Sequence, residues 1–266
     1  MQIRVLTQSD ISAAMRLKEA AGWNQTARDW AVFLDTEPEG CFGIDVDGTL
    51  AATAAVMCYG RDLAWIGMVL TAPEHRGRGL ARCLMEHAIS HAERRGAAVL
   101  KLDGTDMGVK LYRSLGFEDE SAVERWERPP SPAPPAVDLR PGYHPDLDRL
   151  AFGADRATLL ARLAEESAAV ENGYAMGRTG SRAAYFGPCV ATDPAAARRL
   201  LRWFLSRHSS ERIFWDLLPG NREAACLAAE HGFTRLRSLV RMVRPGAAPI
   251  PHNDQYVFAI AGFEFG

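Results

Sequence analysis

The chain has 266 residues, of which 47% are hydrophobic and 24% charged, and its 33 acidic and 31 basic side chains give a formal net charge of -2. This balance is typical of a soluble globular protein. It argues against a nucleic-acid or membrane partner, because binders of polyanions need net positive charge. The length is sufficient for two domains with separate cores.

The cysteines and the start of the sequence indicate a cytoplasmic protein. Five cysteines are scattered without a Cys-x-x-Cys pair, which predicts reduced, buried thiols and no zinc or redox site. The first residues lack a positively charged start followed by an apolar core, and no run of some 18 apolar residues occurs anywhere. We therefore expect a protein that neither enters nor crosses a membrane.

The first half of the chain predicts an α/β unit with a mostly antiparallel sheet. Asp47-Gly48 supplies the positive φ angles of a tight hairpin turn between two strands. The expected elements, in chain order, are a strand at 3–6, helices at 9–21 and 25–34, strands at 41–46, 50–57 and 65–70, a helix at 79–95, a strand at 97–102, a helix at 107–115 and a strand at 122–127.

A proline-rich stretch marks the boundary between two similar units. Residues 129–135 contain five prolines, which exclude helix and central strand. Both flanking segments carry a short helix ending in Gly-Phe, at residues 116–117 and 232–233, so we expect an internal duplication with glycine as the helix C-cap. The predicted domains are 1–128 and 143–266, joined by a linker at 129–142.

A glycine-rich loop between a strand and a helix is the most informative segment. Its residues can aim several backbone N–H groups at one point, with the positive end of the helix dipole behind them, which suits a pyrophosphate. Gly77 and Gly79 allow close approach of the backbone. Residues 76–101 contain six basic and two acidic side chains, so this segment is cationic although the net charge of the whole chain is close to zero.

Two motifs in this half resemble the GNAT superfamily of N-acetyltransferases. They are Arg76-x-x-Gly79-x-Ala81 after a strand and Leu111-Tyr112-x-x-Leu115-Gly116-Phe117 some thirty residues later. The resemblance implies tandem GNAT-like α/β domains, with acetyl-CoA as co-substrate. The cofactor contacts that it implies are Arg76, Gly77, Arg78, Gly79, Leu80 and Ala81 at the pyrophosphate, and the backbone of Val69, Leu70 and Thr71 along the pantetheine. Thr105 and Gly108 depart from the family's usual Asn and Ala.

Two side chains are candidates for the proton transfers. The resemblance implies that Tyr112 is the general acid, and a phenol of pKa near ~10 can protonate a thiolate whose acid has a pKa near ~8.5. Without the motif, Tyr112 would be a core aromatic. Asp103, at a strand end, is the candidate base, although a helix cap or a loop contact would also explain it. Attack by a neutral amine and deprotonation through ordered water both stay open.

The remaining polar residues receive structural interpretations. His87 and His91 have metal-ligand spacing on a helix, but no third ligand accompanies them, so we expect no metal. In the second half, Pro194 is followed directly by Ala195 and Ala228 stands in the place of Tyr112, so this copy is expected to be degenerate. Most of its polar and aromatic residues suit caps or a sheet core, namely Tyr174, Arg178, Tyr185, Trp215, Asp216 and Asn221.

The sequence therefore predicts an acetyl-CoA-dependent N-acetyltransferase, catalytic in its first half, that acts on a primary amine of a small molecule. The alternative is a non-catalytic, acetyl-CoA-responsive binding or regulatory protein. We expect the second domain to wall the acceptor site. Removal of the residues after about 135 is then expected to abolish acceptor turnover and to leave cofactor binding intact. The oligomeric state is left undetermined.

Overall fold

The computed structural model describes residues 2–246 and 250–266. Every element predicted for the first half is present in the predicted order, and the strand at 41–46 has the predicted bounds. Asp47 and Gly48 have positive φ angles of 50° and 75°, as a tight hairpin turn requires. The elements of this half are β1 (Ile3–Val5), α1 (Ile11–Ala20), α2 (Ala27–Thr36), β2 (Cys41–Val46), β3 (Thr49–Tyr59), β4 (Leu63–Thr71), α3 (Leu80–Arg94), β5 (Val99–Gly104), α4 (Asp106–Ser114) and β6 (Glu118–Arg128).

The second half repeats this order from α1 onward, and in place of β1 it has the single antiparallel bridge from Arg140 to Ala169 of β7. Asp193 caps one helix by accepting a hydrogen bond from Ala196, and Asn221 caps the next in the same way, as its sequence context predicts. The elements are α5 (Pro145–Phe152), α6 (Ala157–Leu163), β7 (Glu166–Val170), β8 (Gly173–Arg178), β9 (Ala184–Ala191), α7 (Pro194–His208), β10 (Ile213–Leu217), α8 (Arg222–Glu230), β11 (Thr234–Arg244) and an additional strand, β12 (Val257–Ala259).

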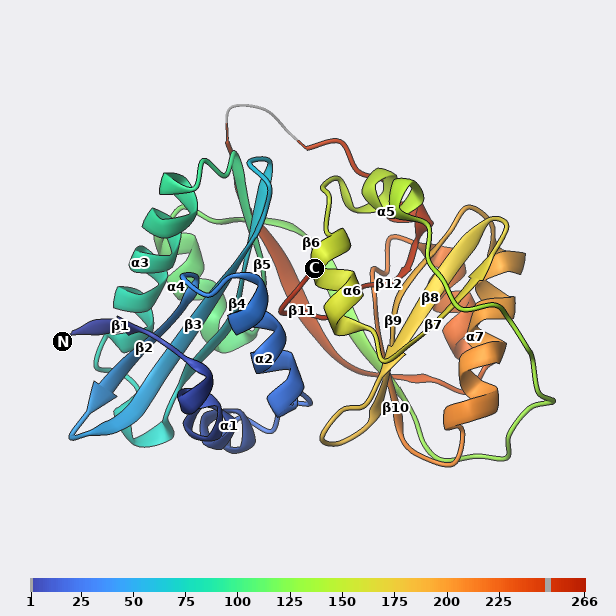
Figure 1. Ribbon diagram of the computed structural model, residues 1–266, viewed down its shortest axis with the longest axis horizontal. Helices are drawn as coiled ribbons and strands as arrows, with labels where there is room; N and C mark the ends of the chain where they lie inside the picture. Colours follow the sequence, from blue (N-terminus) through green and yellow to red (C-terminus); the bar gives the residue numbers. More distant parts are fainter. Residues whose placement is uncertain (1, 247–249) are drawn as a thin grey trace.

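The two halves share one continuous sheet because their last long strands are exchanged. The strand order is β1-β2-β3-β4-β5-β11-β6-β10-β9-β8-β7, with β12 beside β9. Strand β11 of the second half therefore lies between β5 and β6 of the first, and β6 in turn pairs with β10 of the second. Figure 1 shows β6 and β11 running through the centre of the molecule between the two sets of helices.

An arginine–aspartate pair joins each exchanged strand to the half that receives it. Arg241 of β11 lies opposite Asp103 of β5 and donates to both carboxylate oxygens at 2.9 Å. Arg125 of β6 lies opposite Asp216 of β10 and donates at 2.7 and 2.6 Å. Both aspartate side chains are fully buried. The two pairs occupy equivalent positions in the duplicated halves.

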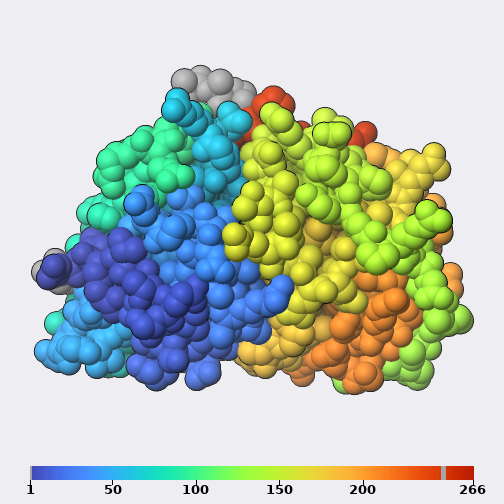
Figure 2. Space-filling view, viewed as in Figure 1, coloured from blue at the N-terminus to red at the C-terminus, as the bar shows by residue number. Residues whose placement is uncertain are grey.

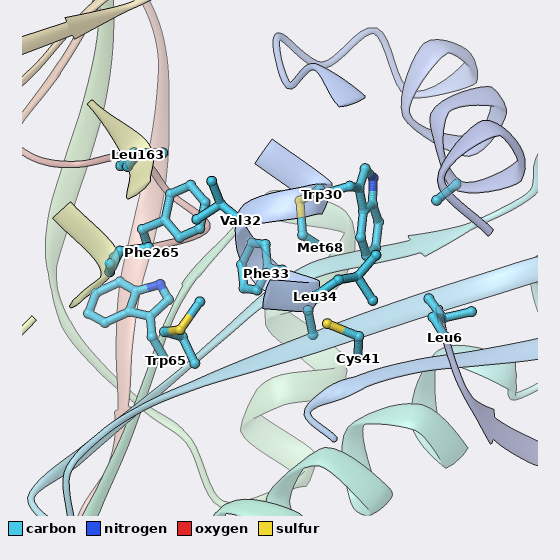
Figure 3. Packing of buried hydrophobic residues seen from close by; sticks show 14 of the residues in the cluster. Leu6, Trp30, Val32, Phe33, Leu34, Cys41, Trp65, Met68, Leu163 and Phe265 are labelled. Atoms are coloured by element: carbon cyan, nitrogen blue, oxygen red, sulfur yellow. The ribbon is translucent and has the colours of Figure 1, made fainter. Parts of the chain in front are cut away.

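The segment 260–266 of the second half packs on the first half. Phe265 stacks on Phe33 of α2 with ring centroids 4.7 Å apart, and Figure 3 shows it between α2 and Leu163 of α6. Trp65 of β4 donates to the carbonyl of Phe263 at 2.9 Å. The space-filling view shows the two halves in contact along their boundary on this face (Figure 2). One hydrophobic core therefore includes side chains from both halves.

Because of this strand exchange, a truncation after residue 135 would disrupt the sheet of the first half as well. Such a cut removes β11 and exposes the hydrogen-bonding edge of β5, while β6 loses both of its neighbours, β11 and β10. The expectation that cofactor binding survives the cut assumed two separately folded sheets, which the exchange rules out. In the described ranges, none of the helices is long and apolar enough to cross a membrane.

Candidate active site

The glycine-rich loop leads from β4 into α3. Gly77 and Gly79 have φ angles of 75° and 82°, and Gly79 is the N-cap of the 15-residue helix α3. The backbone N–H groups of Gly77, Arg78 and Gly79 have no acceptor among the residues that the structure describes. A Cβ at either glycine would meet nothing within 4 Å. The loop thus offers free donors and open space at the positive end of a helix, which fits a pyrophosphate.

The arginines of the loop lie at the surface beside these donors. Arg76 and Arg78 are both exposed. The Nε of Arg76 donates to the carbonyl of Thr71 at 3.3 Å, and Arg78 lies 2.9 Å from Nδ1 of His75. Neither guanidinium is in an ion pair with an acidic group of the described chain. Both are therefore available to a phosphate, and Leu80, which is buried, anchors the first turn of α3 instead.

Strands β4 and β5 open into a gap next to this loop. They pair in parallel only from Leu63 to Trp65, opposite Val99 to Lys101. Strand β11 pairs with the other edge of β5, and among the described residues the stretch of β4 from Val69 to Thr71 has no strand partner on its β5 side. An extended ligand can hydrogen-bond to an exposed strand edge in the way that another strand would. The predicted pantetheine contacts therefore lie at a free edge.

A bulge in β4 shapes the gap. Residues 67 to 70 of β4 span only residues 55 to 53 of β3, so β4 carries one extra residue. Met68 adopts a positive φ of 54°, which is unfavourable for a side chain of its size, and the hydroxyl of Thr53 donates to its carbonyl at 2.8 Å. Gly67 lies so close to the segment 260–266 that a Cβ would be 2.7 Å from the carbonyl oxygen of Glu264.

Tyr112 lies on α4 on the buried side of this gap. Its ring covers the first turn of α4. A Cβ at Gly108 would be 2.9 Å from the phenolic oxygen, so glycine at this position, in place of the family's usual alanine, leaves room for the ring. The hydroxyl has no hydrogen-bond partner in the described part of the chain. Burial raises the pKa of Tyr112 to about 12, so the phenol is protonated at neutral pH. The geometry is that of an available proton donor.

A cavity lies between β4, β5 and the second half. Tyr112 and Asp103 both line it, as do Met68 and Val69 of the bulge. The lining also includes residues that sequence patterns did not single out, from the α1–α2 connection, β11 and the segment 260–266, namely Trp23, Gln25, Arg237, Leu239, Phe263 and Glu264.

Two carboxyl groups face this cavity in different surroundings. Both oxygens of Asp103 accept from Arg241 in the strand-exchange pair described above. Glu264 accepts from Gln25 at 2.8 Å and from Arg178 at 3.4 Å, through different oxygens. Burial raises the pKa of both carboxyl groups above their ordinary values, against the opposing effect of the neighbouring arginine.

The second half lacks the features that make up this site. Helix α7 begins directly at Pro194, Asp193 caps it, and no glycine-rich loop precedes it. Its own parallel strands β9 and β10 pair over only three residues, as β4 and β5 do. There, however, β12 lies beside β9, and Ile260 donates to the carbonyl of Asp216 at 3.0 Å. Strand β12 thus fills the gap that stays open in the first half.

One of the two histidines of α3 lies near two further potential metal ligands. Glu37 and Cys58 lie near His91, with all three potential ligand atoms within 4.8 Å of one another, so the expectation that no third ligand is present does not hold for His91. The Arg95 guanidinium lies 3.3 Å from Glu37 and already balances its charge. His87 packs its ring on Phe42 instead.

Comparison with known proteins places both halves in one family. Residues 11–117 match the acetyltransferase (GNAT) family, and residues 145–259 match an acetyltransferase (GNAT) domain. The chain belongs to the GNAT acetyltransferases and contains two such domains in tandem. Members of this family use acetyl-CoA as co-substrate.

The curated relatives align with only part of this chain. It is 36% identical over 91 residues to streptothricin acetyltransferase of Streptomyces lavendulae, and 33% identical over 87 residues to the ribosomal protein bS18-alanine N-acetyltransferase of Escherichia coli. These alignments cover 31% and 32% of this chain. The chain spans 46% and 57% of the length of these relatives.

A solved structure shares the whole architecture. The crystal structure of a candidate acetyltransferase from Pyrococcus horikoshii superimposes with a TM-score of 0.87 at 20% identity, over all of this chain and 95% of the other. The tandem arrangement described above is therefore found as a fold in at least one solved protein.

The loop conformation can be tested by replacing Gly79 with alanine. We expect Gly79→Ala to lower stability by about 1 kcal/mol, the usual cost of a left-handed residue with a Cβ, and to weaken CoA binding by more than 10-fold as measured by isothermal titration calorimetry. Gly48→Ala is the matched control, since Gly48 also has a positive φ and open space around it. If both variants bind CoA with equal affinity, the loop is not the phosphate site.

Proposed function

We propose that the protein transfers the acetyl group of acetyl-CoA to a primary amine of a small molecule, and that this reaction takes place in the first half. The observation that carries the proposal is the open gap between β4 and β5, which connects a loop of unpaired N–H donors to a cavity containing the unpaired Tyr112 hydroxyl. The resemblance to streptothricin acetyltransferase, named for a small molecule, supports this class of acceptor.

The reaction would proceed by direct transfer. The nitrogen of the amine attacks the carbonyl carbon of the thioester, the carbon–sulfur bond breaks, and Tyr112 donates its proton to the thiolate that leaves. A carboxyl group of the cavity takes the proton that the nitrogen loses. In this scheme residues 76–81 hold the pyrophosphate, and the β4 edge from Val69 to Thr71 aligns the pantetheine in the gap.

Tyr112→Phe separates this reaction from simple cofactor binding. We expect the variant to bind acetyl-CoA like the unaltered chain and to release CoA thiol at least ~100-fold more slowly with any accepted amine, which is the usual contribution of a general acid. Thiol release is followed with a chromogenic disulfide across a library of amines. The non-catalytic, acetyl-CoA-responsive alternative predicts tight cofactor binding and no release with any amine, even by the unaltered chain.

The choice of base is between Asp103 and Glu264. Asp103 was predicted from the sequence and stays a prediction, but its pair with Arg241 has an exact counterpart in Asp216 and Arg125, in the half without a cofactor gap. That symmetry favours a structural role. Glu264 is bound by weaker contacts, since its nearest arginine nitrogen is 3.4 Å away. We infer that Glu264 accepts the proton, directly or through water.

The pH dependence of the two variants distinguishes these roles. A base acts only when deprotonated, so the rate should fall as the pH decreases through its raised pKa. We expect Glu264→Gln to lower kcat by roughly 100-fold and to remove this acidic limb from the profile. Asp103→Asn should instead lower the free energy of unfolding by about 3 kcal/mol or more. A stable Asp103→Asn variant without the acidic limb would assign the base to Asp103.

A further inference from the structure

Arg237 of β11 faces the acceptor side of the cavity. It lines the cavity together with Trp23 of the α1–α2 connection and Phe263, whose ring centroid lies 5.4 Å from its guanidinium carbon. The loop residues 76–81 are absent from this lining. The guanidinium therefore lies on the part of the cavity left for the acceptor rather than beside the predicted pyrophosphate site.

The other charged groups of the cavity have charged partners, whereas Arg237 does not. Asp103 is paired with Arg241, and Glu264 is bound by Arg178. Across residues 2–246 and 250–266, no acidic group lies within ion-pair distance of Arg237, and its Nε is buried without a hydrogen-bond acceptor. A buried donor that has lost its water and gained no acceptor is unfavourable, and each such group in a folded protein calls for an explanation.

The strand geometry keeps Arg237 in this position. A register shift in β11 between Arg235 and Arg237 leaves Leu236 exposed, and Arg237 and Leu239 after the shift line the cavity. Arg235, before the shift, is mostly exposed and pairs with Glu124 at 3.1 Å. Burial, followed by the nearby Arg125 guanidinium, lowers the pKa of Arg237 to about 10, so this side chain is still charged at neutral pH.

We propose that Arg237 binds a carboxylate of the acceptor, so that the substrate is an amine that also carries a carboxylate, as amino acids do. This inference rests on the proposed function and specifies its substrate. The planar guanidinium can donate two parallel hydrogen bonds to a carboxylate, which would satisfy the buried Nε. The aromatic walls formed by Trp23 and Phe263 would pack on the acceptor between its carboxylate and its amine.

Matched amines test the substrate class. Free thiol release is measured with α-amino acids and their carboxamides, each pair compared at equal concentrations of unprotonated amine. We expect the unaltered chain to favour the carboxylate by at least 10-fold in kcat/KM, as a charge-assisted hydrogen bond provides. Arg237→Gln should abolish this preference, while Arg235→Gln, on the same strand but outside the cavity, should retain it. Equal use of acids and carboxamides, or an unchanged preference in Arg237→Gln, would overturn the proposal.

A binding measurement keeps the test independent of turnover. Isothermal titration with N-acetyl-leucine, N-acetyl-leucinamide and inorganic phosphate should show Arg237-dependent binding of the first alone. Phosphate bound in preference to the acid would overturn the carboxylate assignment. If N-acetyl-leucine binds in a manner that depends on Arg237 but the chain acetylates no amine, the carboxylate site is supported and the proposed reaction is wrong. Because Arg237 has neither an ion-pair partner nor an acceptor for its Nε among the described residues, Arg237→Gln should not lower the melting temperature, whereas a large decrease would show a structural role.

Discussion

The two buried arginine–aspartate pairs, Arg241 with Asp103 and Arg125 with Asp216, fix the strand exchange on which the rest of the structure depends. Each aspartate lies on the last parallel strand of its half, and each arginine comes from the strand contributed by the other half. Replacing a buried ion pair by apolar side chains can be neutral, but leaving one charge without its partner is costly. A shift of either exchanged strand by one residue would turn its arginine to the opposite face and separate the pair. The two ion pairs therefore determine which strands lie side by side and also the register between them.

The exchange brings residues of both halves to one cavity. Strand β11 brings Arg237 and Leu239 to the gap of the first half, and the segment that follows it brings Phe263 and Glu264. Among its described residues, the second half closes its own gap with β12, and no glycine-rich loop precedes α7. Its residues form one side of the cavity, and residues of β4, β5 and α4 form the other side.

Local patterns predicted the first half well. Apolar alternation, the Asp47-Gly48 turn and the glycine C-caps are all encoded within a few residues, and the loop at residues 76–81 has a local signature of glycines before a helix. The partner strands of β6 and β11 could not be predicted. Each strand has an alternation of apolar and polar residues that would fit equally well if it paired with strands of its own half. The second half was expected to wall the acceptor site, but the residues that it brings to the cavity could not be predicted, for the same reason. Arg237 and Glu264 have no motif around them, and only the tertiary fold brings them to β4 and β5.

We expect that the first half cannot fold without β11, the strand that the second half contributes. Expression of residues 1–135 and 136–266, separately and together, tests it most directly, with thermal unfolding and CoA binding as readouts. We expect that neither fragment alone unfolds cooperatively, and that the co-expressed fragments purify as a one-to-one complex that binds CoA. A fragment 1–135 that is soluble, melts at the temperature of the full chain and binds CoA with full affinity would contradict it.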